Sequence, residues 1–225
     1  VTGGNYSGTF VFNVSINDVT LNVSNVFFNL TNSTGSQNAT FTASNPASTF
    51  WNATINTSNF ADGIYNITIH ANDTVNNLNS SIVVARLTFD NTKPVPLFGT
   101  GAESDGANIS RSNIYVNVSL TETNEKNITF TLYNSTSSYN QTTFTTAIRT
   151  INWTGLADGA YTFNVTVYDH TGNFNTTETR TVTLDTTIPS ASISCTPNPV
   201  KSGTTLTCTC SSADATSGVQ ATSYT

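Results

Sequence analysis

The chain has 225 residues, of which 9% are charged, and its formal net charge is -6. An acidic chain with so few charges does not suit nucleic acid, which selects a basic face. No apolar run approaches the roughly 18 residues that a transmembrane helix needs. The chain contains no methionine, which indicates a processed product or an excerpt of something longer. Few charges also predict poor hydration, so we expect another hydrophilic group to cover the surface.

Short runs in which apolar and polar residues alternate dominate the first half of the chain. Alternation places every second side chain on one face of a strand, which predicts strands over residues 10–16, 26–30 and 65–69. A tight turn precedes the third run, and Gly63 supplies the positive φ that this turn needs. The positions expected to face a core are Phe10, Phe12, Val14, Ile16, Val26, Phe28 and Leu30.

The second half of the chain repeats this arrangement. The segment Ala157-Asp158-Gly159-Ala160-Tyr161 matches Ala61-Asp62-Gly63-Ile64-Tyr65, and both lead into an alternating strand, a polar turn and another strand. The copies end in the linkers 89–94 and 184–189. A repeat of about a hundred residues has the size of a β-sandwich domain. The expected core positions of the second copy are Ile114, Val116, Val118, Leu120, Ile128, Phe130 and Leu132.

The last stretch predicts the start of a third unit. Alternation favours strands over 191–195 and 204–210, with Pro197 and Pro199 in the turn between them. The first copy, by contrast, shows no proline-led strand before Phe10. Two explanations remain open: the tail donates a strand to the open edge of another copy, or the polypeptide continues and completes a third domain.

The Asp-Gly-x-Tyr elements resemble the corner before strand F of immunoglobulin-like domains, in which a tyrosine hydroxyl bonds to the backbone. Together with the closing Asp-Thr-Thr-x-Pro, the pattern resembles the tandem immunoglobulin-like repeats of large archaeal and bacterial cell-surface proteins. The resemblance implies an all-β fold of tandem sandwiches, with Tyr65 and Tyr161 as structural corners. We expect a first domain over 1–92 without its first strand, a second over 93–187 and a partial third unit over 188–225.

The acceptor pattern for N-linked glycosylation, Asn-x-Ser/Thr, occurs nineteen times. Many acceptors share the outward face of a predicted strand, as Asn66, Asn117 and Asn164 do, so a glycan would leave the core undisturbed. We therefore predict a sugar coat and an extracellular protein. The candidate acceptors are Asn5, Asn13, Asn22, Asn29, Asn32, Asn38, Asn52, Asn56, Asn66, Asn72, Asn79, Asn108, Asn117, Asn127, Asn134, Asn140, Asn152, Asn164 and Asn175.

No catalytic or metal-binding constellation stands out, and we expect neither an enzyme nor a cofactor. His70 and His170 lie at non-equivalent positions of the repeat and are expected to be solvated. Calcium is the competing interpretation of the recurrent aspartates, but each is explained by a turn or by the linker that closes a copy. These aspartates are Asp62, Asp73, Asp90, Asp158, Asp169 and Asp185. The candidates for a disulfide are Cys195, Cys208 and Cys210, with Cys195 bonded to one of the other two.

Three functional classes follow from these observations. We favour a structural subunit or repeat segment of a glycosylated extracellular filament, sheath or stalk, whose partners are further copies of itself. The second class is an adhesin or carbohydrate-binding module, because Phe27, Tyr115, Tyr133 and Tyr168 are expected to face outward. A spacer for a catalytic domain outside this stretch is the third.

Overall fold

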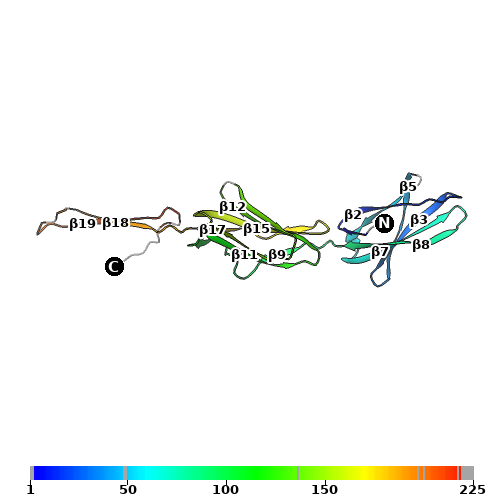
Figure 1. The fold of residues 1–225 in the computed structure, drawn as a ribbon, viewed down its shortest axis with the longest axis horizontal. Helices are drawn as coiled ribbons and strands as arrows, with labels where there is room; N and C mark the ends of the chain where they lie inside the picture. The colour runs from blue at the N-terminus through cyan, green and yellow to red at the C-terminus, as the bar shows by residue number, and fades with distance from the viewer. Residues whose placement is uncertain are drawn as a thin grey trace. The chain divides into compact units, whose positions relative to one another are not determined.

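The computed structural model describes residues 3–47, 50–135, 137–196, 198–199, 201–216 and 218. Nearly all regular structure in these ranges is β-strand, and the helical element is the 3-10 turn η1 (Thr57–Asn59). The protein is all-β, as Figure 1 shows. In the described ranges no helix is long and apolar enough to cross a membrane.

The chain divides into two compact units. The first combines residues 1–94 with 122–126 and 168–175, and the second combines 95–121, 127–167 and 176–225. The sequence-based boundary after residue 92 therefore falls two residues before the end of the first long segment.

The first sandwich has a five-stranded sheet in the order β1-β8-β7-β3-β4 and a three-stranded sheet in the order β2-β6-β5. Neighbours are antiparallel except β1, which pairs parallel to β8 with Tyr6 beside Phe89. The strands are β1 (Gly4–Tyr6), β2 (Thr9–Ser15), β3 (Val23–Asn32), β4 (Gln37–Thr42), β5 (Ser44–Ala47), β6 (Phe50–Asn56), β7 (Gly63–Asp73) and β8 (Leu78–Phe89).

The second sandwich repeats this plan. Its large sheet has the order β10-β17-β15-β12-β13, with β16 also paired to β15, and its small sheet has the order β14-β11-β9. As in the first sandwich, a short strand, β10, pairs parallel to the last one, β17. The strands are β9 (Val95–Phe98), β10 (Ala107–Ile109), β11 (Asn113–Thr121), β12 (Glu125–Tyr133), β13 (Ser138–Phe144), β14 (Thr150–Thr154), β15 (Gly159–Asp169), β16 (Phe174–Thr176) and β17 (Arg180–Leu184).

Each sandwich encloses its own apolar core. Val26, Phe28 and Leu30 are completely buried in the first core, and their counterparts Ile128, Phe130 and Leu132 are completely buried in the second. These inward positions were predicted from alternation and are confirmed. Phe10, Val14, Ile16 and Leu120 lie at the margins and are partly buried.

The tryptophans of the two copies occupy different rungs of their sheets. Trp153 lies opposite Ile114, whereas Ile55 lies opposite the matching Phe10 and Trp51 lies opposite Val14. The additional residues between Trp51 and Phe60 explain this shift, because they lengthen β6 and form η1.

Among the described residues, the first copy has no counterpart of β9, the proline-led first strand of the second copy, and this is the strand expected to be missing. A short strand, β1, does precede Phe10, and it occupies the position that β10 has in the second copy. In the second sandwich β9 pairs with β11, with Phe98 beside Val118, whereas β2 ends its sheet and its pairing among the described residues is with β6.

The tail forms a two-stranded hairpin of β18 (Ser190–Thr196) and β19 (Thr207–Ala213). Within the described ranges these strands pair with each other alone. The sequence-based strands at 191–195 and 204–210 are close to these bounds, although β19 begins three residues later.

Candidate functional site

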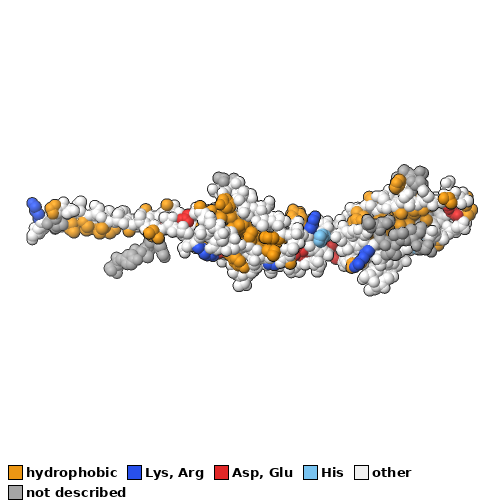
Figure 2. All heavy atoms as spheres, viewed as in Figure 1, with side chains coloured by type: hydrophobic (Ala, Val, Ile, Leu, Met, Phe, Trp, Pro, Cys, Tyr) orange, Lys and Arg blue, Asp and Glu red, His pale blue; other side chains and the backbone are white. Residues whose placement is uncertain are grey.

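The acceptor asparagines lie on the outside of the protein, and none of the nineteen is buried. The alternation that buries an apolar neighbour turns the asparagine outward. On the face in Figure 2, the backbone and side chains that are neither charged nor hydrophobic, drawn in white, cover much of the surface, and charged side chains are sparse. The exposed acceptors are Asn5, Asn13, Asn22, Asn38, Asn56, Asn79, Asn108, Asn140, Asn152 and Asn175. The half-buried acceptors are Asn29, Asn32, Asn52, Asn66, Asn72, Asn117, Asn127, Asn134 and Asn164.

Two of the acceptors singled out from the sequence, Asn117 and Asn164, differ in how free their amide nitrogens are. Asn117 Nδ2 donates a hydrogen bond of 2.9 Å to the carbonyl oxygen of Thr100. A Cβ atom at Gly99 would lie 3.1 Å from the same nitrogen, so the loop backbone packs closely on this amide. Asn164 Nδ2 lies at a long 3.4 Å from Thr179 Oγ1. Asn117 is therefore less available to a sugar than Asn164.

Two acceptors of the first sandwich oppose each other directly. Asn13 of β2 is paired with Asn52 of β6. Side chains at such positions are about 5 Å apart at Cβ, which leaves no room for two sugar chains. Ser44 Oγ donates to Asn52 Oδ1 at 2.8 Å, which adds a neighbour on the Asn52 side. Simultaneous glycosylation of both asparagines would therefore force the chains apart.

The two corner tyrosines make the same contact in both sandwiches. Tyr65 is 4% exposed and Tyr161 is 6% exposed. The hydroxyl of Tyr65 donates to the carbonyl oxygen of Ala61 at 2.8 Å, and that of Tyr161 donates to Ala157 at 3.1 Å. Burial raises the pKa of both phenols. The glycines before them have φ of 153° and 144°, a region that L side chains rarely adopt.

The aspartate of each corner binds the linker that follows the last strand of its sandwich. Asp62 accepts hydrogen bonds from the backbone N–H of Asn91 at 2.8 Å and from the hydroxyl of Thr92. Asp158 accepts from the backbone N–H of Thr186 at 2.9 Å and from the hydroxyl of Thr187 at 2.7 Å. We call these two sets the exit clasps: Asp62 with Asn91 and Thr92, and Asp158 with Thr186 and Thr187.

The exit clasps favour ionised carboxylates. Burial raises the pKa of Asp62, but the hydrogen bonds from Thr92 and Asn91 outweigh it and the pKa is lowered. For Asp158 the hydrogen bonds from Thr187 and Thr186 are the main cause, and they lower its pKa. Charge-assisted hydrogen bonds of this kind are stronger than neutral ones.

The other recurrent aspartates hold turns. Asp73 accepts from the backbone N–H groups of Val75 and Asn77, both at 2.9 Å. Asp169 accepts in the same way from Thr171 at 2.8 Å and Asn173 at 2.9 Å. Among the described residues no three His, Cys, Asp or Glu side chains come together as metal ligands. The local role of these carboxylates is therefore backbone capping.

His70 lies on the outer side of its sheet but is less exposed to solvent than expected. Its imidazole is half-buried and stacks on the ring of Phe27, with centroids 5.0 Å apart and planes 3° from parallel. Its Nε2 lies 3.0 Å from Nδ2 of Asn29. Register explains the difference, because pairing of β3 with β7 places His70 opposite Phe27. His170 is exposed.

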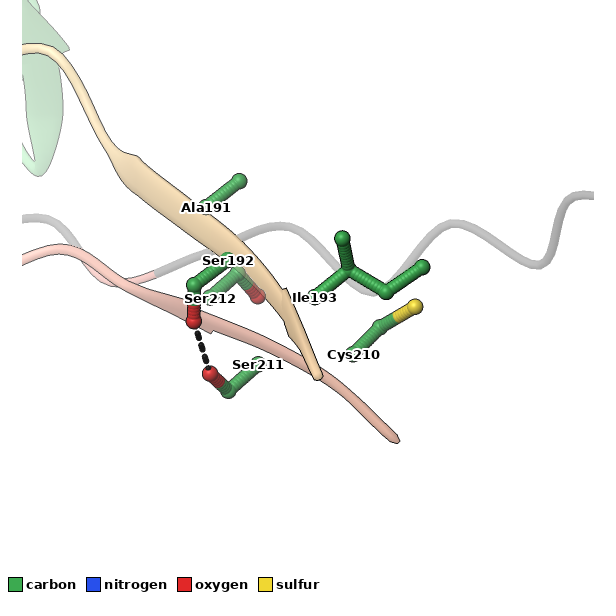
Figure 3. Close-up of a pocket in the computed structure, with 6 residues that line it drawn as sticks. All are labelled: Ala191, Ser192, Ile193, Cys210, Ser211 and Ser212. Atoms are coloured by element: carbon green, nitrogen blue, oxygen red, sulfur yellow. Dashed lines mark hydrogen bonds between the residues drawn. The ribbon is translucent and has the colours of Figure 1, made fainter. Parts of the chain in front are cut away.

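The hairpin has one apolar side and one polar side. Cys195 and Cys208 form a disulfide between its strands, and Cys210 is free and exposed. Figure 3 shows Ile193 beside Cys210, and a hydrogen bond between the hydroxyls of Ser192 and Ser211, 2.6 Å long. These residues line an open hollow of about 470 Å³, and Ile193 is 66% exposed.

The comparisons with known proteins give only distant matches to solved structures. No protein-family model and no curated protein matches it. The fibronectin(III)-like modules of Clostridium thermocellum CbhA are 16% identical with a TM-score of 0.42, over 82% of this chain and 89% of that one. A tetra-tandem repeat from the extending region of a large adhesion protein is 18% identical with a TM-score of 0.36, over 95% of this chain and 61% of that one.

Immunoglobulin domains give a similar result. The Dpr2 Ig1-Ig2 complex with DIP-Theta Ig1-Ig3 matches at 12% identity and a TM-score of 0.39, over 87% of this chain and 66% of that one. Likeness at this level carries no argument about function. The sandwich fold rests on the sheets and cores described above.

Proposed function

We propose that this chain is a structural repeat segment of a heavily N-glycosylated extracellular filament, sheath or surface stalk. The observation that carries the proposal is the sorting of side chains: apolar residues fill two cores, and all nineteen acceptor asparagines lie outside them. Attached sugars would hydrate a surface on which charged residues are only 9% of the chain. The two exit clasps also support the role of a repeat in a series, because in each sandwich the corner aspartate binds the segment that follows the last strand.

The same proposal includes a non-catalytic role and an archaeal host. The recurrent carboxylates support a non-catalytic role, because they accept hydrogen bonds within the exit clasps and the turns. The density of acceptors and the resemblance to archaeal surface repeats support the second.

Glycopeptide mass spectrometry of the native protein tests the sugar coat. We expect sugar on Asn66 and Asn164, and a lower occupancy at Asn117 because its amide nitrogen is engaged by Thr100. Asn13 and Asn52 should not carry sugar on the same molecule. Unmodified asparagine at Asn66, Asn117 and Asn164 together would refute the coat.

Head-to-tail assembly by strand complementation is the proposed mode of self-association. The open edge of β2 supports it, because the matching strand of the second sandwich, β11, pairs with β9 along the corresponding edge. The hairpin supports it as well, with an exposed Ile193 on its apolar side. The strand β18 is already paired with β19 and cross-linked to it. The hairpin would therefore pair with β2 of another copy along an outer edge, the side of β18 or β19 that faces away from the other strand. A head-to-tail contact that does not close makes a filament.

Electron microscopy of native material tests this assembly, with a chain truncated after Thr187 as the comparison. We expect filaments from the full chain and their loss on truncation. A Cys210→Ser variant is the matched control, because it keeps the hairpin and its disulfide. Assembly that persists without the hairpin, or a hairpin covered by its own polypeptide, would contradict complementation.

A carbohydrate-binding adhesin is the second candidate, and one observation favours it. Tyr168 and Phe174 stack with ring centroids 5.0 Å apart, and they are 39% and 49% exposed. Exposed aromatic faces suit the C–H faces of sugars. Titration of the protein with free oligosaccharides, compared with a Tyr168→Ser variant, separates this candidate from the first. Saturable binding lost in the variant would favour the adhesin.

A further inference from the structure

The outer face of the first sandwich carries a pair of parallel rings. Phe27 of β3 and His70 of β7 lie opposite each other in the sheet, and their planes differ by 3°. Their neighbours Val26, Phe28 and Ile69 belong to the core, so the two rings face the outer side. Both side chains are half-buried. Parallel stacking covers one face of each ring.

Acceptor asparagines flank this ring pair on both sides. Asn29 follows Phe27 by two residues, and Asn72 follows His70 by two residues. Residues two apart in a strand share a face and lie about 6.6 Å apart. Because β3 and β7 are antiparallel, Asn29 and Asn72 lie on opposite sides of the pair. A sugar attached to either asparagine therefore starts beside an aromatic surface.

The two acceptors differ in what their amides already do. Asn29 Nδ2 lies 3.0 Å from His70 Nε2, and Asn29 Oδ1 accepts a hydrogen bond of 2.8 Å from Thr40 Oγ1. An amide nitrogen is a donor, so Nε2 accepts and Asn29 holds the plane of the imidazole. Asn72 Oδ1 is buried and has no hydrogen-bond partner. A buried acceptor without a partner costs free energy, which a neighbouring hydroxyl donor would recover.

We propose that Asn72 carries an N-linked glycan whose first sugar is held against the Phe27–His70 ring pair. The proposal rests on the N-glycosylation proposed above and adds a defined contact to it. The C–H face of a pyranose suits the negative face of an aromatic ring, and a sugar hydroxyl is the donor that Asn72 Oδ1 lacks. Asn29 is a positioning residue for His70. The glycan at Asn72 becomes an ordered part of the first unit's outer face.

Nuclear magnetic resonance of the glycosylated protein tests the contact, because ring currents move protons that lie over an aromatic face. We expect upfield-shifted sugar protons that disappear in an Asn72→Gln variant. The shift should also be lost in His70→Ser while the sugar at Asn72, measured by mass spectrometry, remains. The glycan at Asn164 is the matched control, because Thr162 stands two residues before it on the same strand.

The outcomes separate this contact from the sugar coat itself. An Asn72 glycan whose protons resemble those at Asn164 would overturn the contact and leave the coat intact. A glycan on Asn29 with a bare Asn72 would overturn the assignment of the acceptor. Absence of sugar from every asparagine would overturn both proposals. Backbone amide spectra establish that each variant is folded.

Discussion

The two sandwiches differ most clearly at one edge of the small sheet. In the second, β9 covers β11, and Phe98 packs edge-on against Phe163 with ring centroids 5.4 Å apart. The guanidinium of Arg180 lies 4.1 Å from the centroid of the Phe98 ring. In the first, β2 ends the sheet, and β5 is added at the opposite edge. Both small sheets have three strands, but the third strand lies at opposite edges: β9 beside β11 in the second sandwich and β5 beside β6 in the first.

This difference concerns the strand at the start of the second sandwich. The strand β9 begins three residues after Thr92 of the first exit clasp, and it pairs along the edge of β11. Unpaired edges are templates for added strands. The two sandwiches therefore differ at this edge, whereas each encloses an apolar core of its own.

Substitutions in the two cores should lower stability the most, because they remove completely buried side chains. Phe28→Ala and Phe130→Ala each remove a completely buried ring and should cost about 3–5 kcal/mol. The two cores share no residue, so each variant should lower the melting temperature of its own unit in scanning calorimetry. Equal loss in both units from either variant would show that they do not melt independently.

Removal of the ring that β9 contributes should weaken the second unit alone. Phe98→Ala should cost about 1–3 kcal/mol, below the full range for phenylalanine because the ring is half-buried. Leu97→Ala is the control in the same strand, since Leu97 is exposed and such changes stay within about 0.5 kcal/mol. Chemical denaturation measures both. Equal effects of the two variants would contradict the role of Phe98.

The exit clasps should make stability depend on pH. The folded pKa values of Asp62 and Asp158 are depressed, so their stabilisation is present above the unfolded pKa and is lost as pH falls through the folded pKa. Melting temperature should therefore fall on acidification below about pH 5. Asp62→Asn and Asp158→Asn should melt lower than the parent at pH 7 and show a flatter profile in acid. Profiles parallel to the parent's would rule out the exit clasps as the cause.

The corner tyrosines should give the smallest and most equal effects. Tyr65→Phe and Tyr161→Phe each remove one hydrogen bond to a backbone carbonyl and should cost about 0.5–1.5 kcal/mol. Urea denaturation of the two variants compares the corners directly. A cost in one unit and none in the other would show that the corner has a different role in each.

The strands and the cores could be predicted because alternation is local. Val26, Phe28 and Leu30 face inward in any register that keeps one face of β3 buried. Alternation does not specify which strand pairs with which in the sheet. The stacking of His70 on Phe27 and the placement of Trp51 opposite Val14 both follow from pairing between segments distant in the chain. A one-residue change of register would remove either contact.

The sequence by itself determined that this is an all-β chain of repeated sandwiches, with a tyrosine corner in each and acceptor asparagines on their outer faces. Period-two patterns and turn residues carry that information, since they act within a few neighbouring residues. Tertiary structure decided which aspartates bind the linkers, and which acceptor lies beside stacked rings with an unpartnered amide oxygen. These features depend on register and on contacts across tens of residues, which no local pattern specifies.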